Sequence, residues 1–236
     1  MRRFALMLVL FGAGGCGYKW AAKVIDPTLA AGGTVLERGE GSRTSFTIGA
    51  YSFAQESLDR EAVAGSTGLS PDGQARPTER IDLQLTMQVE GRRWGGACRA
   101  LREPTGRADY AAVTDEFHDV VKIDCTFDDG AGATWVLAMA GSLAANLGGT
   151  LEPKHASFAG GGLEVEVLMW RNVWQRVRRH LPEALGQVRA NRKSTAAMVL
   201  ARPEKAWLDS GAPGELLDIS MVTLGALRML PLGFEG

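Results

Sequence analysis

The sequence is poor in the residues that most often carry chemistry. Its 236 residues include three cysteines, three histidines and 7% aromatic side chains. It holds no Cys-x-x-Cys or His-Glu-x-x-His segment, so neither a structural zinc site nor a zincin-type protease is indicated. Serine elbows of the Gly-x-Ser-x-Gly kind and phosphate-binding loops of the Walker kind are missing as well. Local motifs therefore favour a non-catalytic protein without a metal or organic cofactor.

An excess of one charge and a long apolar run are also lacking. The chain carries 26 basic and 27 acidic residues, a formal net charge of −1. Nucleic-acid-binding domains are usually clearly basic, so this balance argues against a nucleic-acid partner. The apolar run at residues 4–11 has about half of the ~20 residues that a membrane-spanning helix needs. With 45% hydrophobic and 22% charged residues, the whole chain has the composition of a folded protein.

The N-terminus has the order of parts found in an export signal. Arg2 and Arg3 give a positive start, residues 4–11 are wholly apolar, and small residues 12–15 precede Cys16. This order is typical of a secretory signal peptide, and a buried N-terminal strand or helix is the alternative.

Ala13-Gly14-Gly15-Cys16 resembles the lipobox of bacterial lipoprotein precursors. The resemblance covers about the first seventeen residues. It implies that residues 1–15 are removed and that Cys16 carries the lipid. Gly17 resembles the residue found in lipoproteins sent to the outer membrane, which implies an anchor there that faces the periplasm. Ala13 departs from the large aliphatic residue usual in the family, and the same small residues would also suit an ordinary signal peptidase.

The odd number of cysteines bears on whether Cys16 carries lipid. If Cys16 carries lipid, Cys98 and Cys125 remain as a pair in an oxidising compartment. Both lie at inward positions of expected strands, so a disulfide between them is plausible, with two buried free thiols as the alternative. We expect residues 16–32 to form a tether or short helix and residues 33–236 to form one globular domain.

Residues 33–170 alternate between apolar and polar side chains. The clearest stretch is 81–90, where five apolar residues alternate with five polar ones, as in a strand with one buried face. Turn residues at 129–132 between two such stretches predict a hairpin. The expected strands cover residues 44–53, 81–90, 94–101, 121–128, 134–140 and 163–170.

The period changes after residue 170. Apolar residues from Val173 to Val188 recur every three or four positions, and residues 213–230 repeat this spacing between two prolines. We therefore predict an α+β fold, in which an antiparallel β-rich body (33–170) is followed by a helical C-terminal third (171–236).

Basic residues gather around the first of these helical stretches, whereas acidic residues gather in a separate segment at 109–129. A basic helical face would suit anionic headgroups or an acidic envelope partner, whereas two merely solvated faces are the simpler interpretation. The basic residues are Arg171, Arg176, Arg178, Arg179, Arg189, Arg192 and Lys193.

The sequence thus favours a lipid-anchored envelope protein that acts as a non-catalytic binding or scaffolding module. Its expected partners are the membrane, reached through the N-terminal lipid, and an envelope protein, an anionic lipid or an apolar ligand. The alternative from another class is a periplasmic hydrolase acting on cell-wall or lipid substrates. The catalytic carboxyl groups of such an enzyme can lie far apart in the sequence and come together only in the folded protein.

Overall fold

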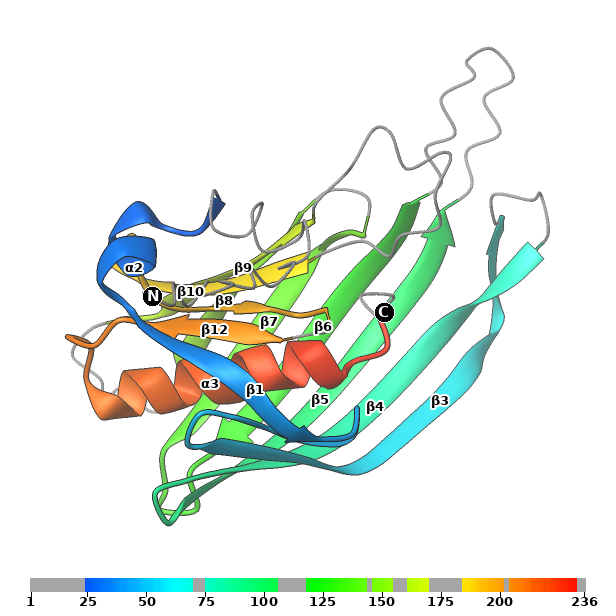
Figure 1. Cartoon of the computed structure of the whole chain (residues 1–236). Coiled ribbons are helices and arrows are strands. Elements are labelled where there is room, and N and C mark those ends of the chain that lie inside the picture. Colours follow the sequence, from blue (N-terminus) through cyan, green and yellow to red (C-terminus); the bar gives the residue numbers. More distant parts are fainter. Residues whose placement is uncertain are drawn as a thin grey trace, which may run out of the picture.

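A computed structural model describes residues 24–69, 75–105, 118–143, 146–154, 161–169, 184–201 and 204–232. Twelve antiparallel strands in these ranges close into a barrel in the order β1-β12-β11-β10-β9-β8-β7-β6-β5-β4-β3-β2. A C-terminal helix runs through the barrel (Figure 1). The elements are α2 (Pro27–Gly32), β1 (Thr34–Gly41), β2 (Ser45–Ile48), β3 (Tyr51–Leu69), β4 (Ala75–Val89), β5 (Arg92–Thr105), β6 (His118–Asp128), β7 (Thr134–Ser142), β8 (Leu147–Pro153), β9 (Leu163–Met169), β10 (Ala184–Ala190), β11 (Lys193–Val199), β12 (Lys205–Leu208) and α3 (Gly214–Met229).

Strands β4 to β9 keep the two-residue period of the sequence. On β4, the residues from Ile81 to Val89 are buried at every odd position, whereas the even positions between them carry polar side chains. The outer faces of β4, β5 and β6 carry charged residues such as Asp82, Arg99 and Asp124. This wall is apolar inside and polar outside, the reverse of the lipid-facing wall of a membrane-spanning barrel.

Tight turns set the register at one end of the barrel. Glu90 and Gly91 both have positive φ (49° and 81°) in the two-residue connection between β4 and β5. Asn191 and Arg192 repeat this conformation between β10 and β11. Two consecutive left-handed residues match the twist of the flanking strands, so each pair closes a hairpin.

The predicted helix at residues 213–230 is present as α3, but its position was not foreseen. It contacts β3, β4, β5 and β6 on one side of the barrel and β10 and β11 on another. From Asp218 to Met229 every residue is buried. Because the helix is enclosed all round, it fills the lumen as a core element. Gly225 lets α3 approach the Phe53 ring, where a Cβ would lie 2.3 Å from a ring carbon.

The predicted α+β class with a helical C-terminal third is wrong. Residues 184–190 and 193–199 form strands β10 and β11 and complete the barrel. Their alternation is hidden because both faces are buried: the inner face meets the core, and the outer face is covered by Ile25 and Leu29 at α2. A strand buried on both sides shows a continuous apolar run, which periodicity cannot separate from a helix.

The described part of the segment expected as a tether or short helix contains the short helix α2, which lies against the outside of the wall. Asp26 caps α2 by accepting a hydrogen bond from the backbone N–H of Thr28, at 2.9 Å. Ile25 and Leu29 then pack with Leu185 and Trp207 on the outside of the barrel. Among the described helices, none combines the length and the apolar character needed to cross a bilayer.

Candidate functional site

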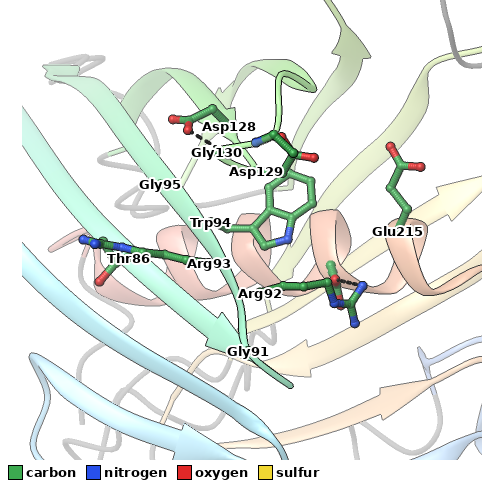
Figure 2. A pocket seen from close by; sticks show the side chains of 12 residues that line it. Thr86, Gly91, Arg92, Arg93, Trp94, Gly95, Asp128, Asp129, Gly130 and Glu215 are labelled. Atoms are coloured by element: carbon green, nitrogen blue, oxygen red, sulfur yellow. Dashed lines mark hydrogen bonds and ion pairs between the residues drawn. The ribbon is translucent and has the colours of Figure 1, made fainter.

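A cleft of about 780 Å³ opens at the end of the barrel where α3 begins. Three connections surround it: the β4–β5 turn, the β6–β7 turn and the start of α3 (Figure 2). The first turn contributes Arg92, Arg93 and Trp94, the second contributes Asp128 and Asp129, and the helix contributes Glu215 and Asp218.

Asp218 lies at the floor of the cleft and is almost fully buried. Its side chain is 2% exposed, and its Oδ2 atom lies 2.6 Å from Nη1 of Arg92, a side chain that is 48% exposed. Burial raises the pKa of Asp218, and the opposing effects of the Arg92 charge and of a hydrogen bond with Trp94 only partly offset this. Burial, together with the nearby charge of Asp218, also raises the pKa of Tyr51 to about 12. These contacts attach the first turns of α3 to β3 and β5.

The rim of the cleft is acidic. Asp129 accepts hydrogen bonds from the backbone N–H groups of residues 131, 132 and 133, which shapes the turn. Asp128, Asp129 and Glu215 have no cationic partner among the residues that the structure describes. Arg93 does not fill this role, since it points toward Thr86 (Figure 2) and its Nη2 atom lies 3.9 Å from Glu56. The cleft therefore presents three carboxylates that a cationic group could meet.

A second charged region lies inside the opposite end of the barrel. Strands β3 to β6 continue past the C-terminal end of α3 (Figure 1), and their inward positions change there from apolar to charged. Arg60 contacts both carboxylate oxygens of Glu79 at 3.0 and 3.1 Å. Arg102 pairs with Asp119, and a cavity of about 270 Å³ lies among these side chains. Each of these charges has an opposite one beside it.

A buried charged triad joins the C-terminal half of α3 to the wall. Glu204 is fully buried and accepts a hydrogen bond from Nε of Arg228 at 2.6 Å and another from Arg38. Burial alone would raise the pKa of Glu204, but the hydrogen bond from Arg38 and the charge of Arg228 lower it overall. Arg38 also donates to the carbonyl oxygen of Ser42 at 2.7 Å. The triad is a structural anchor enclosed in the protein.

The structure places the predicted site residues as follows. Cys98 and Cys125 face each other in the register of β5 and β6 and form a buried disulfide. Arg189 on β10 pairs with Glu166 at 3.4 Å, and Lys193 on β11 pairs with Asp209 at 2.7 Å.

The predicted basic helical face therefore does not exist in its described part, where Arg189 and Lys193 lie on strands and Arg192 lies in a turn. Cys16 and the bases at 171, 176, 178 and 179 lie outside the described residues.

Sequence reasoning missed Asp218, Glu204 and their arginine partners. One signal was available: the otherwise apolar helix at 213–230 contains Asp218 near its start and Arg228 near its end. Ionisable residues at enclosed positions need partners, so each of them indicated a buried contact.

No family model, no curated protein and no solved structure matches this chain.

Proposed function

We propose that the protein is a lipid-anchored envelope protein that acts as a non-catalytic binding module for a protein partner. One observation carries the anchoring part: the disulfide uses Cys98 and Cys125, so Cys16 is the one cysteine of the chain left over. Stable disulfides are typical of oxidising compartments. The lipobox resemblance supplies the chemistry for Cys16, and an outer-membrane anchor facing the periplasm is the proposed address.

The filled lumen favours a protein partner over an apolar ligand. Leu224 and Leu227 of α3 are fully buried in the same core as the inward side chains of the wall. An apolar ligand would have to displace this helix. The open cleft needs no such displacement, and its acidic rim suits basic side chains of a partner.

Mass spectrometry of the protein extracted from its own membrane tests the anchor. We expect the peptide that begins at Cys16 to carry the mass of acyl chains, and Cys16→Ser to abolish both that mass and membrane partitioning. An unmodified Cys16, or unchanged partitioning of the variant, would contradict the anchor.

A photo-crosslinking residue placed at position 215 tests the cleft in intact cells. We expect a discrete protein adduct at this position and none at position 152, an exposed site on β8. The charge-removing pair Asp128→Asn and Glu215→Gln should weaken adduct formation by a crosslinker at Ala131. The matched pair Glu152→Gln and Glu164→Gln, on exposed wall positions, should not. Equal adducts at positions 215 and 152 would overturn binding at the cleft.

A hydrolase acting on cell-wall or lipid substrates is the second candidate, and Asp218 is the observation that favours it. A buried carboxyl group with a raised pKa at the floor of an open cleft is a typical general acid. Incubation with peptidoglycan and with phospholipid vesicles tests this role. Product formed by the wild-type protein and lost in Asp218→Asn would support the hydrolase, whereas no product would leave Asp218 as an anchor of α3.

A further inference from the structure

Strand β3 has one long free edge. β2 pairs only with its first residues, from Ile48↔Tyr51 to Ser45↔Ala54, and the last backbone bond on that side joins the N–H of Gln55 to the carbonyl of Thr44 at 2.7 Å. On its other side, β3 pairs with β4 as far as Leu69. In the part of the chain that the structure describes, no strand lies on the β2 side of residues 56–69, and Figure 1 shows this part of β3 with β4 on its other side.

Two irregularities limit the regular part of this edge. The register with β4 shifts between Gln55 and Ser57, and again between Ala62 and Thr67, where Gly65 has a φ of 75°. Between these bulges, residues 57–62 pair without interruption with residues 84–79 of β4. Six regular residues match the usual length of a strand and expose the backbone groups that an added strand would bind.

The charges on this stretch disfavour pairing with a second copy in the registers centred on residues 59, 60 and 61. Residues on the same face meet when two copies of one strand pair about a two-fold axis. An antiparallel pair centred on residue 59 sets Asp59 against Asp59, and a pair centred on residue 60 sets Arg60 against Arg60 and Asp59 against Glu61. A pair centred on residue 61 opposes Glu61 to itself. Like charges directly opposite each other destabilise a sheet.

Asp59 indicates which kind of side chain an added strand would carry at this edge. It is exposed, has no cationic partner among the described residues, and lies opposite Asp82 in the register with β4. Asp82 is already held by Arg99 at 2.8 Å and by Arg80 at 3.0 Å. Glu61, on the same outer face, pairs with Arg80 at 2.8 Å. A basic side chain on an added strand would give Asp59 the partner that the barrel does not provide.

We propose that residues 57–62 of β3 bind an extended segment of another protein by strand addition, with a basic residue of that segment opposite Asp59. Backbone hydrogen bonds would supply the affinity and Asp59 the preference for charge. This inference goes beyond the binding module proposed above, because the edge shares no residue with the cleft. It depends neither on the lipid nor on the cleft.

The test uses full-length protein in detergent micelles and two peptides that alternate valine and threonine, one with a central lysine and one with a central glutamate. Amide hydrogen exchange should show that the lysine peptide protects residues 57–62. The lysine peptide should also bind at least fivefold more tightly than the glutamate peptide. In Asp59→Lys this preference should reverse, whereas the control Glu152→Lys, at an exposed position of β8, should keep the wild-type preference.

A lack of protection at residues 57–62 with either peptide would overturn the proposal, and so would protection whose charge preference survives Asp59→Lys. Protection of these residues in the protein alone that disappears on dilution would also overturn it, since a second copy would then occupy the edge. Protection confined to residues 128–131 would also contradict strand addition, while leaving the cleft as a binding site.

Discussion

The two anchors of helix α3 each contain a buried carboxylate, and their surroundings differ. At the start of the helix, Asp218 faces Arg92, a cation that is 48% exposed to water. Toward its end, Arg228 meets Glu204, which also contacts Arg38, and the two arginine side chains are 2% and 13% exposed. The pKa of Asp218 is raised and that of Glu204 is lowered.

The difference shows that burial alone does not decide the charge state of an acid. Desolvation is the largest influence on both carboxyl groups and raises both pKa values. Two cations that are themselves buried outweigh it at Glu204, because water screens neither of them. One cation in contact with water does not outweigh it at Asp218. The end near residue 204 is thus held by a carboxylate between two buried arginines, whereas at the other end burial keeps the pKa of Asp218 above that of an ordinary aspartate.

Among these substitutions, replacing Glu204 should have the largest effect on the free energy of unfolding. Glu204→Gln would leave Arg228 buried without its carboxylate partner, which we expect to lower the free energy of unfolding by about 3–5 kcal/mol. Chemical denaturation measures this loss. Glu37→Gln, which removes an exposed pair with Lys205, serves as the control and should cost at most about 1 kcal/mol. A loss of similar size in the two variants would contradict the buried anchor.

Removing the disulfide should destabilise the barrel wall independently of the two anchors of α3. The bond closes a loop of sequence separation 27, so replacing Cys98 and Cys125 by alanine should cost about 2–4 kcal/mol. Because neither bonded cysteine titrates, the loss should be the same from pH 4 to pH 8 in denaturant titrations. A loss that varies with pH would show that the wall and the helix anchors are coupled.

A side chain at Gly225 tests how closely the middle of α3 packs against Phe53. In Gly225→Ala the new methyl group would overlap the Phe53 ring, and we expect a loss of about 1–3 kcal/mol in thermal unfolding. Gly148→Ala is the matched control, because a Cβ at this exposed β8 position meets no atom within 4 Å. Equal melting temperatures for the two variants would mean that α3 does not sit against Phe53.

Asp218→Asn should have the smallest effect at neutral pH. A raised pKa means that the folded state favours the protonated acid, so Asp218 contributes stability at low pH that is lost as the pH rises through its folded pKa. The neutral amide should therefore unfold within about 1 kcal/mol of the wild type at pH 7 and should remove this pH dependence. Melting curves between pH 4 and pH 8 measure it. A large loss at pH 7 would indicate that the charged pair with Arg92 stabilises the fold.

The sequence predicted several strands of the wall that have one exposed face and missed the strands that have none. Strands β1 and β8 were not among the expected strands either, although each has exposed residues. The alternation at residues 81–90 and 121–128 predicted strands that are present in β4 and β6, and the inward positions of Cys98 and Cys125 predicted their disulfide. The strand from Ala184 to Ala190 has the sequence pattern of a helix because α2 covers its outer face, which removes the polar alternation.

The candidate site was harder to foresee than the wall. The helix at 213–230 was predicted, but the sequence could not reveal that it lies inside a barrel, because enclosure depends on strands far away in the chain. For the same reason, Asp218 and Arg92 are brought together by the closure of the barrel and share no local motif. Asp128 and Asp129 fell within the acidic segment that the sequence did single out, although their role was not assigned.

Carboxyl-carbon NMR titration of Asp218 and Glu204 in the folded protein tests whether the two anchors differ in charge as described. Asp218→Asn and Glu204→Gln assign the two signals. We expect Asp218 to take up its proton at a higher pH than an ordinary aspartate, and Glu204 to stay ionised to a lower pH than an ordinary glutamate. Titration of Glu204 above Asp218, or ordinary values for both groups, would contradict the claim that the two anchors of α3 are electrostatically opposite.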